Sequence, residues 1–180
     1  IMNLHPYRGI TASFATKHEK QIFVAPYFAA LEISLMVPDI DTDVLGTFSG
    51  EVAREGTPKE VALKKARMGM EAAGLPHGIA SEGSIGPDPI IPFMNSDIEW
   101  MVWVDTERGI EIVEFHRSLD IVAAQAVLEG SEEIEAFLKR ADFPNHGLIV
   151  RAEKGDEIFK GIRDHKALEA AMNALSASKK

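Results

Sequence analysis

The segment that most constrains the fold is Asp97–Val104, DIEWMVWV, because its apolar residues scarcely alternate with polar ones. A strand with one solvated face alternates, so this segment predicts a central strand buried on both faces. A turn at Asp105–Gly109 separates it from a second strand-like run, Ile110–Phe115, and the two predict a hairpin. Both faces of the sheet that contains this hairpin must then be covered by other elements.

The clearest predicted helix is Thr57–Ala73. Thr57 can act as the N-cap, Pro58 occupies the first helical position, and Glu60 follows the cap by three residues, which is a capping-box pattern. Gly74 stands where a helix commonly ends on glycine.

Shorter elements alternate along the rest of the chain. Apolar runs bounded by polar, glycine or proline residues predict strands at Thr11–Thr16, Glu32–Val37, His77–Ile85, Leu148–Ala152 and Glu157–Lys160. Apolar periodicity and helix-start signals predict helices at Pro26–Leu31, Ser131–Ala141 and Asp164–Leu175. We expect an α/β fold, a mixed central sheet with helices on both faces, in a single α/β domain over residues 1–180. Its core would be 11–117 and its C-terminal α/β extension 118–180.

Charge and composition exclude several classes of function. The 180 residues carry a net charge of −9, which argues against nucleic-acid binding, and they include no cysteine for a disulfide, thiolate metal site or thiol nucleophile. No apolar run approaches the length of about 18 residues that spans a membrane. Basic residues without an apolar block characterise residues 1–20, so we expect no signal peptide and a cytoplasmic protein.

Three segments contain residues suited to phosphate chemistry, and the first is Thr16-Lys17-His18-Glu19-Lys20, directly after a predicted strand. Hydroxyl and ammonium groups at a strand end can bind phosphate. The plain alternative is a solvated charged loop, and His18 could be a phosphate contact, a metal ligand or merely a polar loop residue.

The second segment is the helix Thr57–Ala73. Glu60 could hold a divalent metal ion or simply cap the helix, and Lys65 could bind phosphate or lay its stem over the sheet. The third segment is Ala80-Ser81-Glu82-Gly83-Ser84 at the end of a predicted strand, where ligands of open α/β sheets bind. Glu82 could equally be an exposed turn residue.

The order of these segments, with Gly74-Leu75-Pro76 between the second and third, resembles the inosine triphosphate pyrophosphatase and Maf-like superfamily. The predicted hairpin Glu99–Val113, with the sequence VDTERG at its turn, is similar to the branch of this superfamily that contains the inosine/xanthosine triphosphatases. Nearly the whole chain also resembles a bacterial family with no assigned function, through the motifs ATKH, GTFxGE and FPxHGL.

The superfamily resemblance implies a Mg²⁺-dependent nucleoside triphosphate pyrophosphatase that acts on deaminated or aberrant nucleotides. It implies catalytic roles for Glu82 and Lys20 and metal binding by Glu60 and Glu82. The substrate phosphates would contact Thr16, Lys17, His18, Lys65, Ser81 and Ser84.

Two departures from the superfamily pattern keep other functions open. His18 replaces an asparagine, and Ser81-Glu82 replaces an acidic pair. One alternative is a nucleotide- or phosphometabolite-binding protein without catalysis. The other is a structural domain that forms a homodimer through its apolar hairpin. For either nucleotide function we expect a small-molecule partner, no nucleic acid or membrane partner, and a homodimer.

Overall fold

The computed structural model describes residues 5–16, 20–45, 56–122, 124–127, 134–152 and 157–177. The chain divides into two compact units, Ile1–Leu119 and Asp120–Lys180. The predicted core 11–117 lies within the first unit. That all 180 residues form a single domain stays a prediction.

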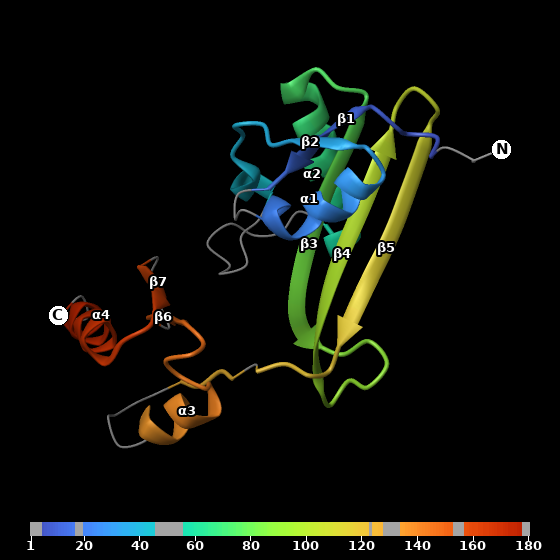
Figure 1. Ribbon diagram of the computed structural model, residues 1–180. Coiled ribbons are helices and arrows are strands. Elements are labelled where there is room, and N and C mark those ends of the chain that lie inside the picture. Colours follow the sequence, from blue (N-terminus) through green and yellow to red (C-terminus); the bar gives the residue numbers. More distant parts are fainter. Residues whose placement is uncertain are drawn as a thin grey trace. The chain divides into compact units, whose positions relative to one another are not determined.

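The first unit is built on a five-stranded mixed sheet with the strand order β2-β1-β3-β4-β5 (Figure 1). β2 and β3 both run parallel to β1, whereas β3, β4 and β5 are joined by antiparallel pairing. The strands are β1 (Thr11–Ala15), β2 (Ser34–Met36), β3 (His77–Pro87), β4 (Asn95–Asp105) and β5 (Ile110–Ser118). The predicted α/β fold with a mixed sheet is therefore confirmed.

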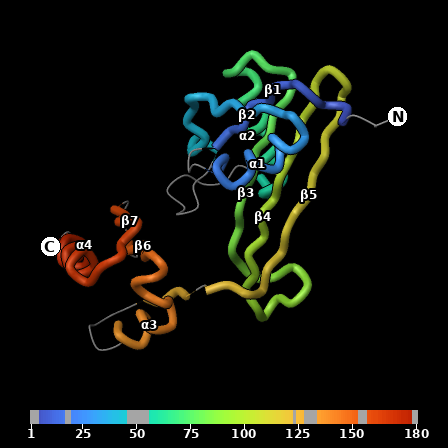
Figure 2. The backbone as a smooth tube through the Cα atoms, in the orientation of Figure 1, coloured from blue at the N-terminus to red at the C-terminus, as the bar shows by residue number. Residues whose placement is uncertain are grey.

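The hairpin is the element that the sequence located best. β4 lies between β3 and β5, and Val102, Trp103 and Val104 are buried, as predicted for a central strand. β4 and β5 both extend beyond the predicted ranges because their ladder runs from Asp105↔Ile110 to Asp97↔Ser118. Figure 2 shows the two strands as long, adjacent stretches of the backbone.

Helices cover both faces of this sheet, as predicted. α2 (Pro58–Ala73) packs through Ala62 and Ala66 against Ala15, Ala80, Val102 and Val104 on one face. On the other face α1 (Gln21–Ala30) packs against a cluster that includes Phe14, Ile79 and Trp103. The alternation of strand side chains explains the two clusters, since Ala80 and Ile79 are neighbours in sequence but belong to opposite faces.

α2 begins and ends as its sequence predicts. The Thr57 hydroxyl accepts a hydrogen bond from the Glu60 N–H, and Glu60 in return accepts from the Thr57 N–H, which completes the capping box. Gly74 adopts φ 64° at the C-terminal end, a conformation that favours glycine.

The prediction that a helix begins at Pro26 is wrong, because α1 begins five residues earlier and Pro26 lies inside it. Pro26 has no N–H to donate to the preceding turn. Val24 and Phe28 nevertheless anchor the helix on the sheet, four residues apart, and the Phe28 ring stacks on Trp103 with centroids 6.1 Å apart. The apolar residues surround α1 rather than forming one stripe, so periodicity did not reveal it.

Two strand boundaries also differ from the prediction. β2 is only three residues long, and β3 continues through Gly86 and Pro87, two residues beyond the predicted strand His77–Ile85. β1 pairs with β3 only as far as Ala80, so the later part of β3 has β4 as its one strand partner among the described residues. A proline is tolerated on such an edge.

The second unit contains a two-stranded antiparallel sheet and two helices. Their shared apolar cluster includes Leu138, Leu148, Ile162 and Leu168. The predicted helix near 164 is confirmed, with Asp164 accepting a hydrogen bond from the Ala167 N–H at 2.8 Å. The elements are α3 (Ile134–Arg140), β6 (Leu148–Arg151), β7 (Ile158–Ile162) and α4 (His165–Ala177).

α3 is described only from Ile134, because the first three residues of the predicted helix Ser131–Ala141 lie outside the described residues. Among the described residues, no helix is long and apolar enough to cross a membrane. A short 3-10 helix, η1 (Thr42–Leu45), follows β2 in the first unit.

Candidate functional site

The candidate site lies where β3 passes the carboxyl end of β1. The chain leaves β1 for β2 on one side and later returns to β3 on the other side of β1. Ligands of open α/β sheets bind at such a change of direction, beyond the carboxyl ends of the strands. β1 ends at Ala15, paired with Ala80, so the next residues of β3 border this position.

Lys20, which precedes α1, reaches across to this part of β3. Its Nζ donates to Ser81 Oγ at 3.2 Å and lies 2.5 Å from Glu99 Oε1. The side chains of Lys20 and Glu99 are 38% and 37% exposed, so solvent reaches this ion pair. The first and third sequence segments are therefore in direct contact.

Lys65 of α2 forms a second ion pair on the neighbouring residue of β3. Its Nζ lies 2.5 Å from Glu82 Oε2, and the side chains are 14% and 9% exposed. Strand alternation places Glu82 on the face that α2 covers, whereas Ser81 is on the α1 face. The two predicted catalytic side chains, Glu82 and Lys20, thus lie on opposite faces of β3.

Glu99 on β4 belongs to the site although sequence reasoning missed it. It pairs across the strands with Gly83, and a Cβ on Gly83 would come within 2.6 Å of Glu99 Oε2. Gly83 therefore leaves room for the Glu99 carboxylate beside β3. The signal that could have located Glu99 is the pairing register of β3 and β4, but this register depends on how far the two strands extend.

The other predicted residues lie around this core to different extents. Thr16 is half-buried directly after β1, whose last residue, Ala15, pairs with Ala80 of β3. Ser84 is half-buried on the same face of β3 as Glu82. Lys17 and His18 lie outside the described residues.

Glu60 has the structural role that the sequence offered as the alternative to metal binding. Its Oε2 accepts from the Thr57 N–H at 2.8 Å and from the Thr57 hydroxyl at 2.9 Å. The hydrogen bond from the Thr57 backbone N–H lowers the pKa of Glu60 most, and the hydrogen bond from the Thr57 hydroxyl lowers it further. Metal binding by Glu60 stays a prediction.

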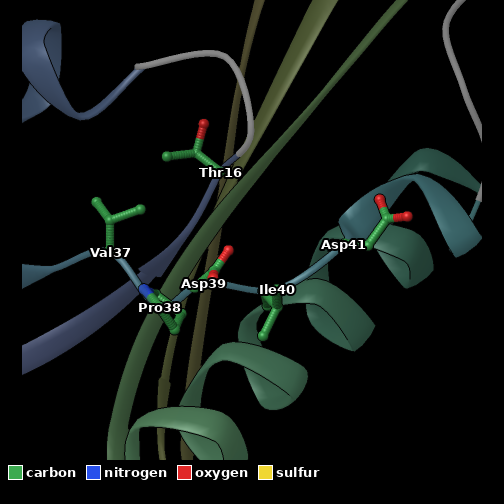
Figure 3. A pocket seen from close by; sticks show the side chains of 6 residues that line it. All are labelled: Thr16, Val37, Pro38, Asp39, Ile40 and Asp41. Carbon is green, nitrogen blue, oxygen red and sulfur yellow. The ribbon is translucent and has the colours of Figure 1, made fainter.

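An open cavity of about 560 Å³ adjoins the carboxyl ends of β1 and β2. Thr16 links this cavity to the end of β1, and Figure 3 shows it opposite the chain that follows β2. The lining residues from that segment are Val37, Pro38, Asp39, Ile40 and Asp41. The cavity thus offers a hydroxyl, two carboxylates and an apolar wall next to the switch point.

A buried ion pair fixes the far end of β3. Asp88 accepts hydrogen bonds from the N–H groups of Ile90 and Ile91 at 2.9 and 2.7 Å and from both Nε and Nη2 of Arg117. Hydrogen bonding to the Arg117 guanidinium holds the pKa of Asp88 well below its usual range. Burial acts in the opposite direction, and the backbone N–H groups lower the pKa further. Asp88 thereby anchors the β3–β4 loop to β5.

The site combines ammonium groups with carboxylates around one stretch of backbone. Lysines can bind phosphate oxygens, hydroxyls can donate to them, and a carboxylate can orient or deprotonate water. Four of the described residues that the sequence singled out are in hydrogen-bonded contact as two pairs, Lys20 with Ser81 and Lys65 with Glu82. The arrangement is suited to binding a phosphorylated small molecule.

Comparison with known proteins places the chain in a family. Residues 65–180 match the family described as Domain of unknown function (DUF6671), and the chain belongs to it. The resemblance to a family with no assigned function is therefore confirmed. No curated protein matches the chain.

Among solved structures, the chain is similar to a crystal structure described as a nucleoside-triphosphatase / dITP/XTP pyrophosphatase from Mycobacterium abscessus. The TM-score is 0.43 and the sequence identity 16%, over 66% of this chain and 77% of that chain.

Proposed function

We propose that this member of the DUF6671 family is a metal-dependent nucleoside triphosphate pyrophosphatase that acts on deaminated or otherwise aberrant nucleotides. The observation that carries the proposal is that Lys20 and Lys65 contact the consecutive β3 residues Ser81 and Glu82, one from each face of the sheet, at its switch point. The order of the three sequence segments, which resembles that of the inosine triphosphate pyrophosphatase superfamily, supports the same function.

In this proposal the phosphate chain binds at the carboxyl end of β1. The Lys20 ammonium exchanges Glu99 for a phosphate oxygen, and the hydroxyls of Thr16 and Ser81 donate to the same group. Lys20 is suited to this exchange because its contact with Glu99 is a solvent-exposed pair between a compact ammonium and one carboxylate oxygen. Lys17, His18, Lys65 and Ser84 complete the proposed phosphate contacts.

Glu82 is the proposed general base. Water attacks the α-phosphorus, its proton passes to Glu82, and the bond from the α-phosphorus to the bridging oxygen of the β-phosphate breaks. The products are a nucleoside monophosphate and pyrophosphate, whose charge Lys20 balances. Such a base contributes on the order of 10²- to 10⁴-fold in rate. Glu82 becomes available as Lys65 turns to the phosphates.

The donor chemistry of the site fits Mg²⁺. Mg²⁺ is held in proteins by one or two carboxylates together with substrate phosphates, and Glu82 supplies one such carboxylate beside the proposed phosphate position. Glu60 is the proposed second ligand, although its Oε2 also caps α2. When bound, Mg²⁺ would neutralise phosphate charge that this acidic chain otherwise repels.

Binding without turnover is the second candidate function. The observation that favours it is that Glu82 and Glu99 each pair with a lysine. Glu82 in particular is buried, with its Oε2 2.5 Å from Lys65 Nζ. A carboxylate neutralised in this way is a weaker base. The chain would then bind a nucleotide or phosphorylated metabolite through the same lysines.

The test incubates the full chain with Mg²⁺ and, separately, ITP, XTP, dUTP and the four common ribonucleoside triphosphates. Pyrophosphate and orthophosphate release are both followed. We expect Mg²⁺-dependent pyrophosphate release with a preference for ITP or XTP, reduced by on the order of 10²-fold or more in Glu82→Gln. Glu135→Gln, an exposed position on α3, is the matched control and should retain full activity.

Two outcomes decide between the candidates. If no triphosphate releases pyrophosphate or orthophosphate but one of them raises the melting temperature, the chain binds nucleotides without hydrolysing them. Full turnover by Glu82→Gln would remove the assigned base.

The proposal includes a homodimer and a cytoplasmic location, where nucleotides of this class are found. The dimer surface would be β5, an edge strand whose Ile112 and Phe115 are exposed. A solution mass equal to one chain would exclude the homodimer.

A further inference from the structure

A second polar cluster lies at the opposite end of β3 from the candidate site. His77 is the first residue of β3, and it pairs across the strands with Asp105, the last residue of β4. Glu107 follows in the turn to β5. The nitrogen and carboxylate oxygens of these three side chains lie within 4.8 Å of one another.

The His77 imidazole presents a buried nitrogen to this cluster. His77 is only 4% exposed, and its Nε2 has no hydrogen-bond partner among the residues that the structure describes. Nε2 lies 3.7 Å from Asp105 Oδ1 and 3.9 Å from Glu107 Oε2, both too long for hydrogen bonds. A buried polar atom without a partner in a native protein calls for an explanation.

The spacing fits a metal ion better than it fits direct hydrogen bonds. Nitrogen and oxygen ligands at about 2.0–2.2 Å from Zn²⁺ in tetrahedral coordination lie about 3.4 Å apart. Nε2 is therefore a few tenths of an ångström further from each oxygen than a bound ion requires. The Glu107 side chain is 65% exposed, so it can move by that amount and also gives the ion a path from solvent.

Hydrogen bonds from Tyr7 and Arg108 hold the Asp105 carboxylate in place. Asp105 Oδ2 accepts from the Tyr7 hydroxyl at 2.9 Å and from Arg108 Nη1 at 3.1 Å, and Oδ1 accepts from the Arg108 N–H. Such partners orient ligating carboxylates in known metal sites. Oδ1, the oxygen nearest His77, keeps a further lone pair for a metal ion.

We propose that His77, Asp105 and Glu107 form a binding site for a transition-metal dication of the Zn²⁺ type. One imidazole nitrogen with two carboxylates is a ligand set for Zn²⁺ and neighbouring transition metals, whereas Mg²⁺ and Ca²⁺ take oxygen ligands. The ion would join the start of β3 to the end of β4 and the turn that follows. The site is independent of the proposed nucleotide chemistry, four residues further along β3.

The experiment uses the full chain, treated with a chelator and dialysed, and then titrated with Zn²⁺ alone. Equilibrium dialysis with metal analysis should give one Zn²⁺ per chain. At a hundredfold excess over Kd the melting temperature should rise by about 5–10 °C, because the ion binds only the folded state. The Glu82→Gln variant, which lacks the proposed Mg²⁺ ligand of the candidate site, separates the two sites. It should bind Zn²⁺ as tightly as the unmodified chain does, and Mg²⁺ should not raise its melting temperature.

Variants of the ligands separate the site from adventitious binding. His77→Gln should abolish binding, and Glu107→Gln, which alters an exposed side chain and leaves the core intact, should weaken it about tenfold or more. Glu114→Gln removes the same charge from an exposed position on β5 and should bind as the unmodified chain does. Absence of a saturable Zn²⁺ equivalent, or equal affinity in Glu107→Gln and Glu114→Gln, would overturn the proposal.

Discussion

Four carboxylates on or next to β3 and β4 fall into two groups that are held in different ways. Asp88 and Asp105, which we term the aspartate anchors, each accept a hydrogen bond from at least one backbone N–H group as well as from an arginine side chain. Glu82 and Glu99, the site glutamates, each pair with the ammonium of a lysine from another element. Both groups lie on or next to β3 and β4.

This difference in hydrogen-bond partners distinguishes carboxylates that hold the fold together from carboxylates of the candidate site. Backbone donors and a planar guanidinium fix a carboxylate in position and orientation, whereas a lysine ammonium is a point charge on a flexible stem. The anchors define where β3 and β4 end. The glutamate–lysine pairs can exchange partners without disturbing those strands, as a ligand site requires.

The largest effect on stability should follow from Asp88→Asn. This variant leaves the Arg117 guanidinium, whose side chain is 23% exposed, without its carboxylate and weakens the acceptor for the Ile90 and Ile91 N–H groups. We expect the melting temperature, measured by circular dichroism, to fall by about 5 °C or more. Glu99→Gln is the matched change at the site and should cost clearly less; an equal loss would show that the two groups do not differ.

Acid should reveal the same anchor with a smaller effect. The pKa of Asp88 is lower in the folded than in the unfolded chain, so its ionisation stabilises the fold above the ordinary aspartate pKa of about 3.9 and that stabilisation declines as the pH falls below it. Urea unfolding at pH 7, 4 and 3 should show the deficit of Asp88→Asn shrinking as the pH decreases. A deficit that stays constant over this range would contradict the assigned pKa shift.

Much of the framework could be predicted from the sequence because its signals are local. α2 carries its cap, first-turn proline and terminal glycine within the sequence Thr57–Gly74, and the central strand β4 shows its burial in an unbroken apolar run. α1 could not be located in this way. Its apolar residues surround the helix, and Phe28 is placed by stacking on Trp103, which is 75 residues away in the chain.

The site was predictable only where its residues adjoin strand ends. Lys20, Ser81 and Glu82 follow or interrupt apolar runs, so the contact of Lys20 with Ser81, next to Glu82, could be anticipated from the ends of parallel strands. Glu99 lies inside a strand, and its place opposite Gly83 depends on the register of the β3–β4 ladder. The distribution of Glu82 and Lys20 over opposite faces likewise depends on that register rather than on spacing in the sequence.

The smallest stability effect should come from Lys20→Gln, which sharpens the comparison by separating stability from binding. Because the Lys20–Glu99 pair is more than a third exposed, its loss should change the free energy of unfolding by no more than about 1 kcal/mol. The same change should weaken the binding of inorganic triphosphate, measured by calorimetry, by about tenfold or more, since a charge-assisted hydrogen bond to phosphate is lost.

Ionic strength and a matched variant make this last result specific. Added salt should weaken triphosphate binding to the unmodified chain more than to Lys20→Gln, because exposed charge interactions are screened. Lys139→Gln, an exposed lysine on α3, removes the same charge outside the candidate site and should leave both stability and binding unchanged. If Lys20→Gln bound triphosphate as tightly as Lys139→Gln does, the Lys20–Glu99 pair would belong with the framework, and the phosphate position would have to be sought elsewhere on the sheet.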